Sequence, residues 1–306
     1  MKRHFSFFIA VGMIFSTAIT SCNRDEDTIE PNPGTIEMTT EVTGDVTFSM
    51  YGTGLATVDW GDGSTKETGT FTVDVPIEFS HTYSTSKIRT IRIYGNDIWG
   101  LNCSNIPLIS LDVSKNANLW SLFCFDNQLT SLDVSKNPKL RNLGCGKNQL
   151  TTLDLSNNII LGHLQCHDNP LISLDLSKNT SLYYFTTWRN QLTSLDVSKN
   201  TSLVHLVCVQ NQLTNLDVSK NISLSYLDCW DNQLTSLDMS NNTTLVYLNC
   251  YSNQFTDDAL DALFGSLHSN PNIIGETEKY ISIQDNPGTT TCNTNIATEK
   301  GWRVIN

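Results

Sequence analysis

Basic residues are scarce in this 306-residue chain: 19 Lys and Arg stand against 31 Asp and Glu, for a formal net charge of −12. Proteins that bind nucleic acid need a basic footprint, so this balance argues against a nucleic-acid partner. Catalytic signatures are also missing, because the chain contains no G-x-S-x-G, H-E-x-x-H or G-x-x-x-x-G-K sequence. We therefore expect no enzyme activity and no cofactor.

Paired metal-binding cysteines are absent as well. Seven of the nine cysteines recur at a 21-residue step, never as C-x-x-C, which is the wrong spacing for zinc. Sulfurs one step apart would be within disulfide reach. However, Thr187 and Ile283 occupy equivalent positions, which favours buried thiols acting as small hydrophobic side chains. Cys292 lies outside this series and has no evident partner.

No apolar run is long enough to span a membrane. The longest, Phe5–Ile19, follows Lys2 and Arg3 and is typical of a targeting segment covering residues 1–21. Its end, Ile19-Thr20-Ser21-Cys22, resembles a bacterial lipoprotein signal, which implies that Cys22 is the lipid-modified first residue of the mature chain. An ordinary secretory peptide, leaving Cys22 as a free thiol, is the alternative.

Residues 22–34 are polar and contain two prolines, which predicts a flexible tether. The tether begins with an acidic run that resembles the export signal of surface lipoproteins in some Gram-negative bacteria. The resemblance implies a lipid-anchored protein of the outer membrane, exposed at the cell surface. A solvated linker is the alternative interpretation of this run.

What the chain has in abundance is repetition at a 21-residue period. An apolar residue, a cysteine and an aspartate each return at this step, the aspartates at Asp112, Asp133, Asp154, Asp175, Asp196, Asp217 and Asp238. A fixed period of this length predicts stacked coils that share one continuous core. The aspartate column is read either as a cation-binding ridge or, preferably, as a solvated face beside serines and a lysine column (Lys115, Lys136, Lys178, Lys199, Lys220).

Each coil contains its own half-period. Leu119-x-x-Leu122-x-Cys124-x-x-Asn127 is followed by Leu129-x-x-Leu132-x-Val134-x-x-Asn137. Alternating apolar residues in each half predict two short parallel strands per coil, each closed by an asparagine that bonds the backbone of a turn. The fold class predicted is mainly β, with residues 97–306 forming the solenoid and its C-terminal cap.

The pattern LxxLxCxxNQLTSLDVSKN resembles the short, nested leucine-rich repeats of bacterial cell-surface proteins. The match is specific and covers seven full repeats and a half, from about Ile98 to Phe255. The resemblance implies a protein-binding surface module, with adhesion or host interaction as its role. After Phe255, helical spacing from Asp257 to Leu267, a strand near Tyr280 and a last strand near Trp302 predict the cap that closes such a solenoid.

Residues 35–96 predict a small all-β domain. Val46–Met50, Phe71–Val75 and Arg89–Tyr94 alternate as strands do. The sequences DWGDGS, from Asp59, and HTY, from His81, resemble the β-sandwich domain named after polycystic kidney disease, a common spacer or adhesive module.

Asp59 and Asp62 could bind calcium, but we favour the interpretation that their carboxylates stabilise the turn beside a packed Trp60. For His81 we favour a hydrogen-bonded core residue over a metal ligand. Ile91 and Ile93 fit the half-repeat template, so we expect this strand to close the first coil and hold the two domains together.

Variation between repeats indicates where a ligand binds. The second half of each coil barely changes, whereas the positions before and after the cysteine vary and are often aromatic. Exposed aromatic residues without a core role mark recognition surfaces. The predicted ligand-binding face comprises Phe123, Phe125, His167, Trp188, Arg189, Trp230, Asp231 and Tyr251. A protein partner is favoured. The alternatives are a glycan stacked on Trp188, Trp230 and Tyr251, or a structural spacer that binds nothing.

Overall fold

The computed structural model describes residues 34–270 and 278–306, which belong to one compact unit, Asn32–Asn306. The predicted signal segment, Cys22 and all of the tether but residue 34 lie outside the described residues. Among the described residues, no helix has both the length and the apolar character needed to cross a membrane.

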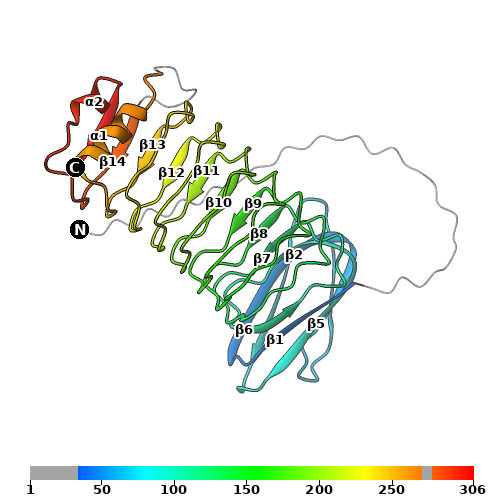
Figure 1. The fold of residues 1–306 in the computed structure, drawn as a ribbon. Coiled ribbons are helices and arrows are strands. Elements are labelled where there is room, and N and C mark those ends of the chain that lie inside the picture. Colours follow the sequence, from blue (N-terminus) through cyan, green and yellow to red (C-terminus); the bar gives the residue numbers. More distant parts are fainter. Residues whose placement is uncertain (1–33, 271–277) are drawn as a thin grey trace, which may run out of the picture. The chain divides into compact units, whose positions relative to one another are not determined.

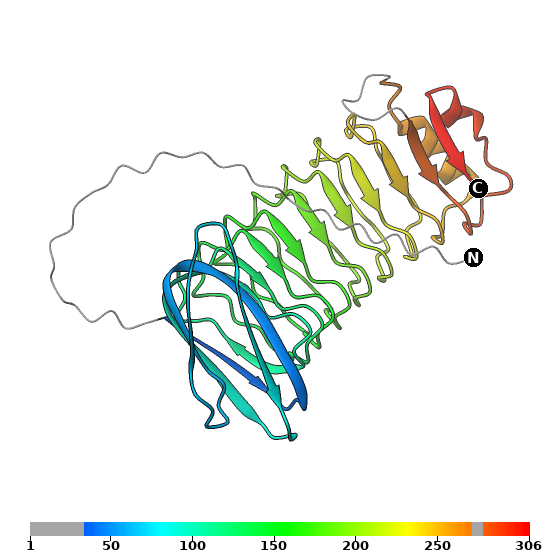
Figure 2. The same ribbon diagram turned by 180° about the vertical axis from the view of Figure 1, so that it is seen from behind.

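Successive coils each contribute one three-residue strand to a single parallel row (Figures 1 and 2). The strands are β7 (Ser121–Phe123), β8 (Asn142–Gly144), β9 (His163–Gln165), β10 (Tyr184–Thr186), β11 (His205–Val207), β12 (Tyr226–Asp228) and β13 (Tyr247–Asn249). Pairing is in register, so that Leu206 lies beside Phe185 and Leu227. Equivalent residues of different repeats therefore form straight columns across the sheet.

The predicted fold class is confirmed, but the prediction of two strands per coil is wrong. Between neighbouring coils, the second halves are joined by bonds such as that from the Gln149 N–H to the Leu129 carbonyl, 2.9 Å. The backbone N–H of Ser135 is instead donated to the carboxylate of Asp133, 2.8 Å away. Short polar side chains compete with a ladder for backbone donors in this way, so the aspartate that recurs in every repeat turns the chain out of the sheet.

Two ladders of buried asparagines connect the coils. Asn148 accepts the Leu129 N–H at 3.0 Å and donates to the carbonyls of Cys124 and Cys145 at 2.9 and 3.0 Å. In the second ladder, Asn158 donates to the carbonyls of Val134 and Asn137 at 3.1 and 3.0 Å. These amides form hydrogen bonds with buried backbone groups that three-residue strands leave without partners, which confirms the predicted role of the asparagines.

The core is one cluster of leucines, valines and cysteines running through the coils. The thiols of the seven repeat cysteines are buried and unpaired, which confirms their prediction as small hydrophobic side chains. At the gap in the series, Thr187 is also fully buried, and its hydroxyl accepts the Asn190 amide at 3.1 Å. Cys292 is half-buried and free.

The N-terminal part is antiparallel. Its strands are β1 (Gly34–Thr40), β2 (Gly44–Asp59), β3 (Glu67–Thr70), β4 (Ile77–Tyr83), β5 (Arg89–Asn102) and β6 (Leu108–Asp112). The long β2 pairs with β3, β4 and β5, while β1 lies between β5 and β6. Phe48, Trp60 and Phe79 pack together beneath these strands. The predicted strand at Phe71–Val75 is wrong: Asp74 has φ 59°, and a tight turn joins Thr72 to Val75.

Strand β5 crosses the boundary expected between residues 96 and 97. It pairs with β1 and β2 and then, through Gly100–Asn102, with β7, the first strand of the parallel row. Ile91 and Ile93 are buried in the same core cluster as Leu101 and Cys103. The β-domain and the solenoid therefore share one sheet and one core, in line with the expectation that this strand closes the first coil.

The C-terminal elements agree with the helix and the two strands predicted after Phe255. Helix α1 (Asp257–Ser266) begins after Thr256, whose hydroxyl accepts the Ala259 N–H. Strands β14 (Lys279–Ser282) and β15 (Trp302–Ile305) extend the parallel row, and the short helix α2 (Asn295–Thr298) precedes β15. Leu260, Leu263 and Phe264 of α1 are fully buried, so the helix packs against the core in the coil between β13 and β14 (Figure 1).

We expect Asn148→Ala to destabilise the protein by about 2 kcal/mol, because it leaves the buried Leu129 N–H without a partner and removes one of the two asparagine donors to each of the Cys124 and Cys145 carbonyls. Urea unfolding followed by circular dichroism measures this loss. Asn157→Ala is the matched control, since the amide of Asn157 is exposed and makes one long bond to the Ser135 carbonyl, 3.3 Å. Equal unfolding midpoints for the two variants would contradict the role given to the ladder.

Candidate functional site: the outward face of the parallel strands

The side chains that point out of strands β7–β13 form the strand face. On each strand the central residue is buried and the first residue points outward, mostly half-exposed. Three columns result: the first strand residue, the third strand residue and the residue after the cysteine position. A fourth set, the turn column, consists of the residues that come one position after each third-column residue in the sequence.

Most of the predicted aromatic residues lie in the third column, where they stack on one another. Phe125 stacks on His167 with ring centroids 5.7 Å apart, and His167 stacks on Trp188 at 4.3 Å and 6°. Phe123, from the second column, joins this run through Phe125 at 5.9 Å. Trp230 and Tyr251 form a separate run at 4.7 Å. Arg189 and Asp231 belong to the turn column.

The first column is an aromatic ladder that the sequence analysis missed. His163, Tyr184, His205, Tyr226 and Tyr247 stack with centroids 4.3–4.4 Å apart. Burial lowers the pKa of His163 and of His205 to about 4, so both imidazoles are neutral at physiological pH. The sequence does contain a signal for this ladder, since its members recur three positions before the cysteine position at the same 21-residue step.

The second column carries small and polar side chains between the two aromatic columns. Its members on β9–β13 are Gln165, Thr186, Val207, Asp228 and Asn249. Thr186 is only 4% exposed, and neither its hydroxyl nor one oxygen of Asp228 has a hydrogen-bond partner among the described residues. Burial raises the pKa of Asp228 to about 7, although hydrogen bonds from Trp230 and Asn249 act in the opposite direction.

Every member of the turn column has a left-handed backbone, although none is glycine. The φ angles lie between 51° and 54° at Asp126, Lys147, Asp168, Arg189, Gln210, Asp231 and Ser252. Aspartate tolerates this region, but lysine, arginine and glutamine adopt it at a cost of about 1 kcal/mol or more. The repeats thus hold long polar side chains at positions where glycine would be less strained.

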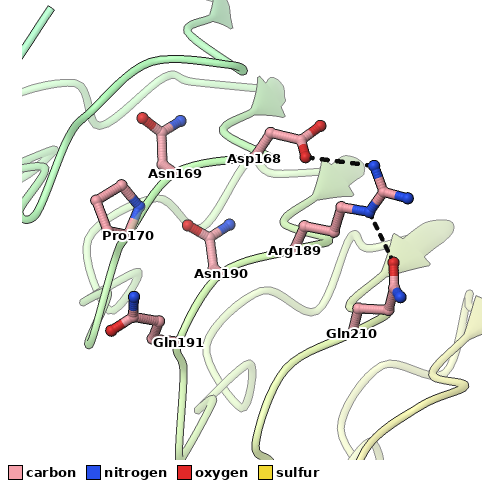
Figure 3. Close-up of a pocket in the computed structure, with 7 residues that line it drawn as sticks. All are labelled: Asp168, Asn169, Pro170, Arg189, Asn190, Gln191 and Gln210. Carbon is pink, nitrogen blue, oxygen red and sulfur yellow. Dashed lines mark hydrogen bonds and ion pairs between the residues drawn. The ribbon is translucent and has the colours of Figure 1, made fainter.

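These polar side chains bond to one another along the column. The Arg189 Nε donates to the Gln210 amide oxygen at 2.8 Å, and its guanidinium lies 3.7 Å from a carboxylate oxygen of Asp168 (Figure 3). Gln210 in turn donates to Asp231 at 3.2 Å. Arg189 also lies over the Trp188 ring, 5.3 Å from its centroid. A surface depression beside this network is lined by Asp168, Asn169, Pro170, Arg189, Asn190, Gln191 and Gln210.

The aspartate column lies elsewhere on the coil and has a structural explanation. Each carboxylate accepts the backbone N–H of the serine two residues later, at 2.8–2.9 Å. Hydrogen bonds from Ser135 lower the pKa of Asp133, and equivalent bonds do the same at Asp154, Asp175, Asp196 and Asp217. No cluster of potential metal ligands occurs in the described part of the chain.

Turn chemistry also accounts for the acids of the β-domain. Asp59 and Asp62 accept the backbone N–H groups of Gly61 and Ser64, each at 3.0 Å. His81 bonds Asp62 at 2.7 Å and stacks on the buried Trp60 at 4.9 Å. These carboxylates and the imidazole are thus engaged within the fold, as the sequence favoured.

Comparison with solved structures supports a leucine-rich-repeat assignment. The functional domain of InlJ from Listeria monocytogenes, described as including a cysteine ladder, is 29% identical, with a TM-score of 0.52 over 72% of this chain and 50% of that chain. A leucine-rich-repeat protein of Leptospira interrogans is 21% identical, with a TM-score of 0.54 over 63% and 50%. The fold is a leucine-rich-repeat solenoid. This chain therefore matches about half the length of each protein. No protein-family model and no curated protein matches it.

We expect Asp228→Asn to stabilise the solenoid more at pH 8 than at pH 5. The Asp228 carboxyl keeps its proton up to about pH 7 when folded but loses it near pH 4 when unfolded, so its contribution to stability falls as the pH rises between these values. The difference between variant and parent should grow by roughly 2–3 kcal/mol at most from pH 5 to pH 8.

Urea unfolding at the two pH values measures this growth. Comparing variant with parent removes the opposite contribution of His163 and His205, whose lowered pKa values make stability rise over part of the same range. Asp217→Asn is the control, because the lowered pKa of Asp217 confines its effect to acidic pH. A constant difference for Asp228→Asn would contradict the assignment.

Proposed function

We propose that the chain is a cell-surface binding scaffold whose strand face engages a protein partner, in adhesion to host or neighbouring cells. The observation that carries this proposal is the pair of aromatic columns on the strand face, His163 to Tyr247 and Phe125 to Tyr251. Large aromatic side chains that remain partly exposed beside charged groups supply most of the binding energy in protein interfaces. No catalytic arrangement competes with this role in the sequence.

Ring geometry favours a protein over a glycan. Sugars pack against the faces of aromatic rings, but the faces within each run are covered by neighbouring rings at 4.3–5.9 Å. What most of these rings present to solvent is an edge. Aromatic edges carry partial positive charge and pack well against carbonyl groups and other rings, which protein surfaces supply. A glycan remains the second candidate only at the end faces of the runs.

The strained turn column supports the same proposal. Lys147, Arg189 and Gln210 keep a left-handed backbone that glycine would adopt with less strain. Arg189 is 59% exposed, so its ion pair with Asp168 adds little to stability. A polar rim beside an aromatic surface is the usual arrangement of a protein interface. Contact with a partner would therefore explain why long polar side chains occupy these positions.

A double substitution tests the binding face. We expect the full chain to retain a protein ligand on arrays of extracellular proteins and glycans, and Trp188→Ala/Trp230→Ala to weaken that binding at least 100-fold, or about 3 kcal/mol. Ile159→Ala/Ile222→Ala is the matched control, since both isoleucines are exposed, at 55% and 60%, in turns away from the strand face. Circular dichroism and thermal unfolding verify that each variant folds.

Three other outcomes would overturn parts of this proposal. Equal loss in both double variants would move the site away from the strand face. A ligand found only among the glycans would replace the protein partner by the second candidate. A chain that binds nothing on either array would leave a structural spacer as the function.

We further propose that residues 1–21 are a lipoprotein signal and that a lipid on Cys22 anchors the mature chain in the outer membrane, facing outward. The signal-like segment and the acidic, proline-containing run up to residue 34 support this placement. Residues 35–96, which resemble the polycystic-kidney-disease type of domain, would then join the anchor to the solenoid. Because β5 passes from this part directly into the parallel row, the two would be presented as one rigid arm.

Cys22→Ser tests the anchor. We expect the parent to fractionate with membranes, to carry a diacylglyceryl group on Cys22 by mass spectrometry, and to be removed from intact cells by added protease. The variant should appear in the soluble fraction, because one thioether-linked lipid is the proposed attachment. A parent that is soluble, or that is cleaved before a residue other than Cys22, would contradict the proposal.

A further inference from the structure

Three large apolar side chains are exposed at one corner of the β-domain. Leu55 is 59% exposed, Val73 82% and Val75 54%. Leu55 pairs with Thr70 of β3, and the tight turn that carries both valines begins two residues after Thr70. The three side chains therefore come from neighbouring stretches of backbone. We call them the apolar corner.

The backbone at this corner turns apolar side chains toward solvent. Strand β2 bulges there, since its register with β5 shifts between Thr53 and Ala56. On the other side of the corner, Val73 occupies a central position of the tight turn and is followed by Asp74, with φ 59°. Such positions usually carry polar residues or glycine. A largely exposed valine adds little to the core, so its apolar character needs another explanation.

Three aromatic side chains lie next to the corner. Tyr51 points out of the same face of β2 as Leu55, since the residue that follows each of them is buried. The Tyr51 ring stacks on Trp99 of β5 with centroids 5.0 Å apart, and Trp99 meets Trp120 edge to face at 5.9 Å. All three rings are partly exposed. We call Tyr51, Trp99 and Trp120 the aromatic edge.

This combination has the chemistry of a surface that rests in a lipid bilayer. Exposed aliphatic side chains gain free energy when they enter the acyl region. Tryptophan and tyrosine favour the headgroup level, because their rings are apolar while their N–H and O–H groups stay in contact with water. Residues 50–59 and 67–79, which build the corner, contain no lysine or arginine. Contact would therefore depend on apolar burial and not on attraction to anionic lipids.

The chain that leads to Cys22 enters the fold beside this corner. Gly34, the first described residue, pairs with Gly95, and Gly95 pairs on its other side with Ala56, the residue after Leu55. These three adjacent strands are about 10 Å across. Cys22 precedes Gly34 by twelve residues, which extend to about 40 Å at most. A lipid on Cys22 would therefore keep the apolar corner within reach of the bilayer.

The other end of the molecule has no such connection. Strand β15 lies nine steps along the row from β5, or about 40 Å away at ordinary strand spacing. An anchor at Gly34 thus favours an orientation in which the β-domain is near the membrane and the C-terminal coils are farther from it.

We propose that the apolar corner and the aromatic edge form a membrane-contact surface, which rests in the phospholipid bilayer that holds the lipid of Cys22. This inference rests on the proposed lipid anchor and goes beyond it. A single lipid at the end of a twelve-residue segment limits distance but leaves orientation free. A second contact restricts how the strand face is presented to a partner.

Vesicle flotation tests the contact without the anchor. Residues 22–306 carrying Cys22→Ser contain the whole compact unit and lack both the signal and the lipid. This soluble chain is mixed with vesicles of phosphatidylcholine and phosphatidylethanolamine at about 5 mM lipid, and the floating share is measured. We expect a partition coefficient of about 10³ M⁻¹, roughly tenfold below that of a myristoyl chain. Adding phosphatidylglycerol should not strengthen binding, because the chain is acidic.

Two triple variants locate the contact. Leu55→Ser/Val73→Ser/Val75→Ser should lower the partition coefficient at least fivefold. Ile159→Ser/Ile172→Ser/Ile222→Ser is the matched control, since it removes three apolar side chains of similar exposure, 55–61%, from turns of the solenoid. The control should float as the parent does. Circular dichroism and thermal unfolding verify that both variants fold.

Brominated phosphatidylcholine gives an independent measure, because it quenches only tryptophans close to it. The parent should be quenched on binding. Trp99→Phe/Trp120→Phe should lose most of this quenching, whereas Trp188→Phe/Trp230→Phe, which alters the strand face, should keep it.

The possible results separate this surface from the anchor. A parent that does not float, equal flotation of the parent and the corner variant, or quenching that survives Trp99→Phe/Trp120→Phe would each overturn the membrane-contact surface. If mass spectrometry finds a lipid on Cys22 but the soluble chain does not float, the anchor stands and the surface fails. If the chain floats as expected but Cys22 carries no lipid, the surface stands and the anchor fails.

Discussion

The asparagine ladders are the constraint on which the rest of the structure depends. A three-residue strand cannot pair all the backbone groups of a 21-residue coil, and a buried unpaired group costs about 1–3 kcal/mol. Each asparagine amide pairs several such groups at once and links one coil to the one before it. Because this linkage repeats in every coil, successive coils keep the same spacing and register.

The fixed spacing determines the chemistry of the strand face. Rings that recur at every coil stack face to face at 4.3–4.4 Å, as in the column from His163 to Tyr247, and so present their edges. A ring face becomes available only where a repeat substitutes another residue. Gly146 lets its neighbours close together, whereas Val209 keeps them apart. A difference of one residue in one repeat can therefore change how the neighbouring rings stack without altering the coil.

Much of the fold could be predicted because the same pattern of apolar and polar positions recurs in every repeat. The period, the buried cysteines, the asparagine turns and the helix after Phe255 all follow from which positions are apolar and which recur. The prediction of a second strand failed because alternation of Leu132 and Val134 reports only burial. Whether a buried extended segment pairs as a strand depends on its backbone donors, and the Asp133 carboxylate takes one of them. The half-repeat spacing of Ile91 and Ile93 indicated that the two parts pack together, but it did not show that one strand, β5, continues through both.

The sequence by itself determined the coil, its core and the aromatic character of the variable positions, because these depend on residue type and spacing alone. The tertiary structure decided which of those aromatic residues share a column and which face of each ring is covered. It also decided that one buried polar atom each of Thr186, His205 and Asp228 lies on adjacent strands without a hydrogen-bond partner among the described residues. Such relations join residues of different coils, between 19 and 42 positions apart in the examples given. They exist only once the coils are stacked, because stacking brings those side chains within contact distance and excludes water from between them.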